Sequence, residues 1–180
     1  NKDEPQKKSD LDKFQKAAVE NTHNRLLIIA GPGSGKTTVL TRRIAYLIKE
    51  TGVPAEKFLA ITFTRRAAGE MRERLHKLLP DNAEYINIHT FHSLCLSILK
   101  ENYEKAGLSE DFKVISEQEK TLYKEEEITK DMLVFDDLIT LTVKLFEDYP
   151  EIAQTYRERF KYLSVDEYQD IDENQYKLIK

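Results

Sequence analysis

The feature that most constrains the fold of this chain is a glycine-rich stretch that joins an apolar run to a segment with helical periodicity. The apolar run is Leu26-Leu27-Ile28-Ile29, and the helical pattern extends from Thr38 to Lys49. The stretch between them reads Ala30-Gly31-Pro32-Gly33-Ser34-Gly35-Lys36-Thr37-Thr38. A strand, a glycine-rich loop and a helix that opens with Lys-Thr are typical of a phosphate-binding loop, in which backbone N–H groups and the helix N-terminus face one anion. The pattern therefore predicts a nucleotide site.

The residue types of this loop each suit a contact with a nucleotide. We expect Lys36 to reach the β- and γ-phosphates and the Thr37 hydroxyl to bind Mg²⁺. The other loop residues would surround the phosphates: Ala30, Gly31, Pro32, Gly33, Ser34, Gly35 and Thr38. The strict motif has glycine where this chain has Ala30. An ordinary glycine-rich turn is the alternative, and the combination of several glycines with the Lys-Thr pair disfavours it.

Apolar runs and helical patterns alternate along the chain, which predicts an α/β fold with a parallel sheet and helices on both faces. Continuous apolar runs are typical of strands that such a sheet buries on both faces. Strands are expected at residues 25–30, 58–63, 85–88 and 162–165, with a short one at 112–115. Helices are expected from Ser9 or Asp10 to about Asn21, and at 38–49, 64–77, 92–106, 131–146 and 150–160, with Thr64 and Ser116 as candidate caps.

The composition limits the class of protein. At 180 residues, the chain suits one domain, or one domain with a small insertion. Its net charge of −4 disfavours a protein that coats nucleic acid uniformly, but it leaves room for a local basic groove. The single cysteine, Cys95, lies between leucines, so we expect a buried side chain in a reducing, cytoplasmic location. We find neither an apolar run of ~18 residues nor a signal-peptide core, so no membrane partner is expected.

An acidic cluster follows the last expected strand. It reads Asp166-Glu167-Tyr168-Gln169-Asp170, directly after the apolar residues 162–165. Parallel sheets bind ligands at the carboxyl ends of their strands, where these side chains would lie. We expect Asp166 to hold Mg²⁺ and Glu167 to act on the attacking water as a general base. An acidic surface loop is the alternative, and the phosphate-binding loop upstream disfavours it.

The helix expected after residue 64 carries the densest basic stretch of the chain. Its basic residues are Arg65, Arg66, Arg72, Arg74, His76 and Lys77. They suit contacts with phosphate groups. Glu70 and Glu73 are interleaved with them, so a solvated helix face with paired charges is the alternative.

Four sequence motifs, in this order, resemble those of the UvrD/Rep/PcrA group of superfamily 1 DNA helicases. They are Gly31–Thr37, Thr62-Phe63-Thr64 with Ala67–Met71, Thr90-Phe91-His92-Ser93, and Val165–Asp170. The resemblance extends from about Leu11 to the C-terminus, and the group often has alanine at the position of Ala30. It implies a RecA-like P-loop NTPase domain that binds ATP and Mg²⁺ and drives movement on single-stranded DNA, with 3′-to-5′ polarity.

The resemblance also implies roles for individual residues. Gln15, which its position alone would make an exposed helical glutamine, would recognise adenine. Lys36 and Thr37 would serve the triphosphate and Mg²⁺. The catalytic set would be Lys36, Asp166 as Mg²⁺ ligand, Glu167 as base and Gln169 as the residue that couples nucleotide state to its surroundings. The DNA path would be lined by Thr62, Phe63, Thr64, Thr90, Phe91 and His92, with Arg65 and Arg66 in place of the usual Asn-Lys pair.

The resemblance further predicts how the chain is organised. Residues 1–10 would be a flexible lead-in, residues 11–93 and 135–180 the ATP-binding domain, and residues 94–134 a reduced helical insertion. The group continues into a second RecA-like domain with arginine fingers, which lies beyond Lys180. We therefore expect this part of the protein to bind nucleotide weakly and to hydrolyse it poorly. Expected partners are single-stranded DNA or a single-strand/double-strand junction, the second domain, and repair or nuclease-complex proteins.

Two other functions remain open at this stage. A P-loop phosphotransferase would need an acceptor pocket, and it leaves the 166–170 cluster unexplained. A helicase-like subunit of a nuclease or repair complex could act as a nucleotide-dependent DNA-binding module. The presence of Lys36, Asp166 and Glu167 favours an active ATPase over that module.

Overall fold

Three parallel strands form the central sheet of the computed structural model, which describes residues 11–23, 26–29, 31 and 33–180. The strands are β1 (Phe58–Thr62), β2 (Asn87–Thr90) and β5 (Tyr162–Val165), in the order β2-β1-β5. Thr62 is in register with Thr90, and Ile61 with Val165. The carboxyl ends of all three strands therefore meet at one edge of the sheet, and the predicted parallel sheet is confirmed.

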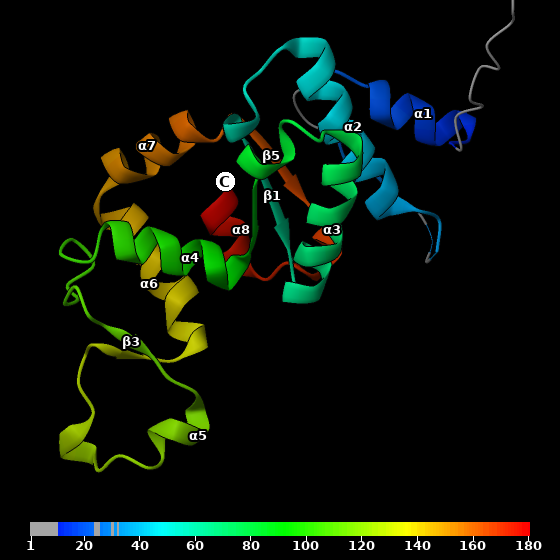
Figure 1. The fold of residues 1–180 in the computed structure, drawn as a ribbon. Coiled ribbons are helices and arrows are strands. Elements are labelled where there is room, and N and C mark those ends of the chain that lie inside the picture. Colours follow the sequence, from blue (N-terminus) through cyan, green and yellow to red (C-terminus); the bar gives the residue numbers. More distant parts are fainter. Residues whose placement is uncertain (1–10, 24–25, 30, 32) are drawn as a thin grey trace, which may run out of the picture.

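Helices cover both faces of this sheet (Figure 1). Successive side chains of a strand point to opposite faces, so alternate residues of β1 pack in two different cores. Phe58 and Ala60 belong to the first core, together with residues of α2 (Lys36–Thr51) and α3 (Arg65–Leu78). Leu59 and Ile61 belong to the second core, with residues of α4 (Phe91–Glu101) and α6 (Phe135–Asp148). The continuous apolar run of β1 is thus explained by burial on both sides.

The remaining elements are shorter. They are α1 (Lys13–Glu20), α5 (Glu117–Lys120), α7 (Pro150–Arg159), α8 (Glu173–Ile179), β3 (Lys113–Val114), β4 (Met132–Leu133), and the 3-10 turns η1 (Ala55–Lys57), η2 (Ala83–Tyr85), η3 (Glu125–Glu127) and η4 (Tyr168–Asp170). In the described part of the chain, no helix combines the length and the apolar character that crossing a bilayer requires.

Local cap chemistry sets several helix starts. Thr64 accepts a hydrogen bond from the Ala67 amide, and Ser116 forms a capping box at the start of α5, as predicted. The first helix begins later than predicted, because Asp12 is its cap. Ser9 and Asp10, like the whole expected lead-in 1–10, lie outside the described residues.

The predicted first strand is wrong for residues 26–29, which form no strand. Leu27 is 62% exposed and Ile29 is 87% exposed. Within the described residues, β5 pairs with β1 alone, so the sheet ends at β5. An apolar run shows that a segment gains free energy from burial, but it does not supply the neighbouring strand that a β-strand needs. Arg25 and Ala30, the ends of the predicted strand, lie outside the described residues.

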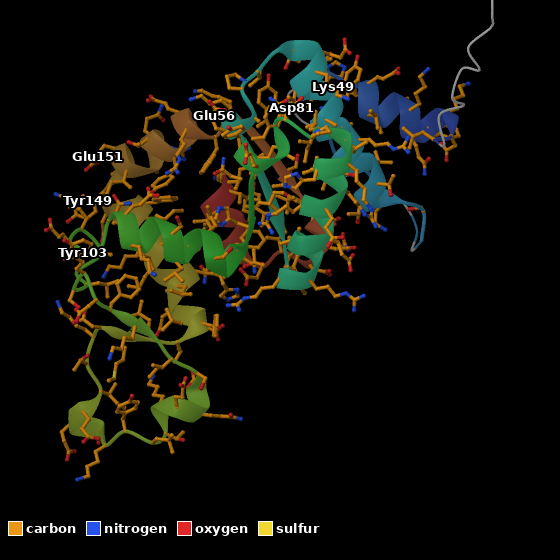
Figure 2. All side chains as sticks on the ribbon, viewed as in Figure 1. Lys49, Glu56, Asp81, Tyr103, Tyr149 and Glu151 are labelled. Carbon is orange, nitrogen blue, oxygen red and sulfur yellow. The ribbon has the colours of Figure 1, made fainter. Side chains whose placement is uncertain are left out.

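The segment between α4 and α6 forms an arm that projects from the body of the domain (Figure 1). It contains the parallel pair β3-β4 and the one-turn helix α5, so it has less helix than expected. Residues 94–101, the start of the expected insertion, belong to α4 and pack in the second core. Tyr103 and Tyr149, labelled in Figure 2, pack against the same core.

Candidate functional site

The glycine-rich loop turns sharply before α2. Gly33 and Gly35 have φ values of 73° and 80°, in the left-handed region that favours glycine. The carbonyl oxygen of Gly31 accepts hydrogen bonds from the Ser34 hydroxyl at 2.6 Å and from the Lys36 ammonium at 3.1 Å. The Lys36 ammonium therefore folds back over the loop, and α2 begins at Lys36 itself. Ala30 and Pro32 lie outside the described residues.

The structure brings the two predicted Mg²⁺ ligands together, although they are far apart in sequence. The Thr37 hydroxyl donates a hydrogen bond to Asp166 Oδ2 at 3.0 Å. Asp166 is buried, and its other carboxylate oxygen accepts from the Glu167 amide at 3.0 Å. Its own amide donates to the carbonyl of Ile61 on β1, also at 3.0 Å. The strand end thus fixes the carboxylate at the start of α2.

These two oxygens fit an octahedral Mg²⁺ site. With Mg²⁺–oxygen distances of 2.0–2.1 Å, adjacent ligands lie about 2.9 Å apart, close to the separation of the Thr37 and Asp166 oxygens. The described residues contain no cluster of three or more His, Cys, Asp or Glu that could hold a metal ion. Mg²⁺ commonly takes only one or two protein ligands and completes its shell with phosphates and water, so the small donor set suits this ion.

Glu167 occupies a different environment from its neighbour Asp166. Its backbone is left-handed, with φ 52° and ψ 45°, and this turns the chain directly after the strand. The side chain is exposed, and its carboxylate accepts a hydrogen bond from the Gln169 amide nitrogen. The adjacent carboxylates can therefore serve separate tasks, one buried beside Thr37 and one open to solvent.

Gln15 lies against the phosphate-binding loop. Its side-chain nitrogen donates to the carbonyl of Ser34 at 2.9 Å, and its side-chain oxygen accepts from the Asp12 amide at 3.0 Å. The sequence position alone suggests a fully exposed side chain, but the structure shows that the Gln15 side chain is partly buried. The structure thus groups Gln15 with the loop, Thr37 and Asp166.

The residues of the expected DNA path divide into buried and accessible groups. The side chains of Thr62, Thr90 and Phe91 are buried, so any contact that they make with DNA would come from their backbones. Thr90 caps α4 by accepting from the Ser93 amide. Thr64, Arg65 and Arg66 are exposed, and Phe63 and His92 are partly exposed.

We use the name aromatic surface for three accessible rings, Phe63, His92 and Phe135. Phe63 packs edge-on against the buried Phe91, with ring centroids 5.5 Å apart. His92 packs edge-on against Phe135 at 5.6 Å, and Phe135 is 49% exposed. No motif in the sequence predicts Phe135 as part of this surface. Its available signal was an aromatic residue at the first position of an amphipathic helix, directly before Asp136-Asp137-Leu138.

Comparison with known proteins places this geometry in a family. The UvrD/REP helicase N-terminal domain matches residues 11–133 and, in an overlapping segment, residues 120–180. The chain belongs to this family. It is 36% identical to the ATP-dependent DNA helicase PcrA of Staphylococcus aureus (strain Mu50) over an alignment of 222 residues, and this alignment covers 92% of the present chain. The PcrA of Bacillus subtilis (strain 168) is 36% identical over 228 residues and covers 96% of it. The chain spans only 30–31% of the length of these relatives.

In this UvrD/REP-type domain, the basic helix α3 also reaches the phosphate-binding loop. The guanidinium of Arg74 donates to the Thr38 hydroxyl at 3.2 Å. The sequence predicts Arg74 only as part of a basic helix face. By contrast, Arg66 pairs with Glu70 at 2.9 Å on the exposed side of α3, as the solvated-face alternative expects for that residue.

Burial shifts the pKa of two groups near the strand ends of the domain. It raises the pKa of the Cys95 thiol to about 12, so this side chain is an unreactive part of the core, as predicted. Burial, together with the positive charge of Arg72, lowers the pKa of His89. The Nδ1 atom of His89 and the Ser93 hydroxyl are hydrogen-bonded across 3.2 Å.

Proposed function

We propose that this chain is the ATP-binding motor domain of an ATP-dependent DNA helicase that moves along single-stranded DNA. Residues 11–93 and 135–180 form the motor domain in this proposal, and residues 94–134 form its insertion. The observation that carries it is the hydrogen bond between Thr37 and Asp166, 3.0 Å long. This contact joins the phosphate-binding loop to the acidic strand end, at the same sheet edge that carries the aromatic surface.

ATP binding would use contacts along the start of α2. Each end of the Gln15 side-chain amide already has one contact within the chain, and its second hydrogen and second lone pair match N7 and the amino group of adenine. Lys36 and the amides of the loop would hold the phosphates. Thr37 and Asp166 would hold Mg²⁺, which neutralises charge that develops on the phosphate oxygens.

Hydrolysis would depend on the exposed carboxylate of Glu167. This carboxylate accepts a proton from the attacking water. The side-chain amide of Gln169 already hydrogen-bonds the carboxylate and orients it. In related phosphoryl-transfer enzymes, an arginine supplied by another domain raises the rate by ~10³–10⁵. We propose that a second RecA-like domain supplies this arginine in the longer protein, so that the present chain alone hydrolyses ATP slowly.

The aromatic surface would hold single-stranded DNA. Bases stack on exposed rings without sequence preference, at ~1–3 kcal/mol per base. Phe63, His92 and Phe135 supply such rings, and the exposed Thr64 and Arg65 lie where they can meet phosphate groups. Movement in the 3′-to-5′ direction and action at single-strand/double-strand junctions are part of this proposal.

Binding measurements on this chain test the proposal directly. Titration with a fluorescent ATP analogue and Mg²⁺ should show saturable binding that Lys36→Ala abolishes. Fluorescence anisotropy with labelled oligo-thymidine should show weaker binding for Phe63→Ala and His92→Ala. Phe14→Ala is the matched control, because this ring is 83% exposed on α1 and outside the aromatic surface. Equal DNA affinity for all three variants would contradict the DNA path, and ATP turnover that survives Glu167→Gln in the longer protein would contradict the mechanism.

A further inference from the structure

The short helix α1 carries Gln15, yet very little apolar burial fixes its position. Of its described residues, Val19 alone is buried. In addition to its packing along α2, two sets of polar contacts attach the helix to this region. Near its N-terminus, Gln15 donates to the carbonyl of Ser34 in the phosphate-binding loop. Near its C-terminus, backbone carbonyls accept hydrogen bonds from the guanidinium of Arg43, which lies on α2.

Arg43 supplies hydrogen-bond donors and a positive charge at the C-terminus of α1. Its guanidinium donates to the carbonyl of Ala18 at 3.1 Å, to the carbonyl of Asn21, and to the carbonyl of His23 at 3.4 Å. The last carbonyls of a helix have no partners within the helix, and a cation is favoured beside them. The last turn of α1 has no basic residue of its own. Burial lowers the pKa of Arg43 from its ordinary value, and the carbonyls replace the solvent that this cation has lost.

We propose that Arg43 is a positioning residue for recognition of the adenine base. It fixes the C-terminal end of α1 to α2, so that Gln15 near the opposite end stays in one place relative to the loop that holds the phosphates. The inference rests on the proposed ATP site. Without Arg43, the C-terminal end of α1 would lose these carbonyl contacts and Gln15 could shift relative to the loop, whereas Lys36, Thr37 and the loop would stay in place.

The test separates recognition of the base from recognition of the phosphates. Affinities of this chain for ATP, GTP and inorganic tripolyphosphate are measured with Mg²⁺ for Arg43→Gln, Gln15→Ala and the double variant. Loss of one positioned hydrogen bond should lower the preference for ATP over GTP by about 2- to 10-fold, with tripolyphosphate affinity unchanged. The double variant should be no less selective than Gln15→Ala, because both changes remove one interaction. Arg43→Lys, which keeps the charge without the planar fork, should retain part of the preference.

Arg157→Gln is the matched control, since it removes the same charge from an exposed site on α7. It should leave all three affinities unchanged. Normal selectivity in Arg43→Gln, alongside reduced selectivity in Gln15→Ala, would overturn the role of Arg43 and leave the ATP site intact. An equal loss of ATP and tripolyphosphate affinity in Arg43→Gln would also overturn it, because Arg43 would then support the whole loop. If the unmutated chain does not prefer ATP over GTP, the proposed adenine contact itself fails.

Discussion

The backbone at Glu167 provides a quantitative test of how the site is built. Among the described residues, it is the one non-glycine residue with positive φ, at 52°. A side chain with a Cβ costs roughly 1–2 kcal/mol in the left-handed conformation, and glycine does not incur this cost. Strained residues of this kind are concentrated at functional sites. Glycine at position 167 should therefore relieve this strain while it removes the proposed catalytic base.

The comparison of Glu167→Gly with Glu167→Ala isolates this backbone effect. Both variants lose the carboxylate and its contact with Gln169, so those losses cancel. Relief of roughly 1–2 kcal/mol of strain is opposed by the greater flexibility of glycine in the unfolded chain, about 0.5–1 kcal/mol. The glycine variant should be more stable by about 0.5–1 kcal/mol. For a chain of this length, that difference raises the Tm by about 1–4 °C.

Gly69, in the middle of α3, is the matched control. A Cβ at this position would meet no atom within 4 Å, and the backbone there is not left-handed. Gly69→Ala should therefore stabilise the domain by about 0.5–1 kcal/mol, so the preference between glycine and alanine has opposite signs at the two positions. Thermal unfolding followed by circular dichroism measures both differences. If alanine is preferred at position 167 as well, the argument from the left-handed backbone is refuted.

Three further predictions follow from the contacts at the site and in the core. Asp166→Asn should remove the Mg²⁺-dependent gain in ATP affinity and leave binding in EDTA unchanged, as calorimetry in the two buffers would show; a retained gain would contradict the assignment of the ligand. Phe135→Ala should weaken oligo-thymidine binding by about 5- to 100-fold, measured by anisotropy, with little change in Tm because the ring is half exposed. The pKa of Cys95 is raised from 9.0 to about 12, so the folded state keeps a proton that the unfolded state releases. The free energy of unfolding should therefore fall as the pH rises above 9, and urea denaturation of Cys95→Ala should show a flatter pH dependence.

Features with local causes could be predicted from the sequence. The strand predicted at 58–63 is found at Phe58–Thr62, and the strand at 162–165 coincides with Tyr162–Val165. Both follow from short apolar runs, and the caps at Thr64 and Ser116 follow from hydroxyl groups at helix starts. The strand predicted at 25–30 is wrong for the described residues 26–29, because strand formation depends on a neighbouring strand, which is a non-local property. The apolar pattern contains no information about which strand is at the edge of the sheet.

The candidate site was predictable to a similar degree. Motif spacing predicts that Lys36, Thr37 and Asp166 share one site, and the geometry of parallel sheets explains why the strand end that carries Asp166 lies beside Thr37. Accessibility could not be read from the motifs. Phe91 is part of a motif yet buried under Phe63, whereas Phe135 is outside the motif yet exposed beside His92. Which ring of an aromatic cluster reaches the surface is decided by tertiary packing.

The arrangement also gives a physical route between the two parts of the proposed site. The amide of Asp166 is hydrogen-bonded to the carbonyl of Ile61, and Phe63 of the aromatic surface lies two positions further along the same segment. All five residues of β1 are buried, and β1 is paired on both sides. If Asp166 moves when Mg²⁺ binds, a strand held in this way would pass that displacement on to Phe63. Binding free energies are coupled reciprocally, and DNA on the aromatic surface should therefore change the affinity for Mg²⁺-ATP by the same factor by which Mg²⁺-ATP changes the affinity for DNA.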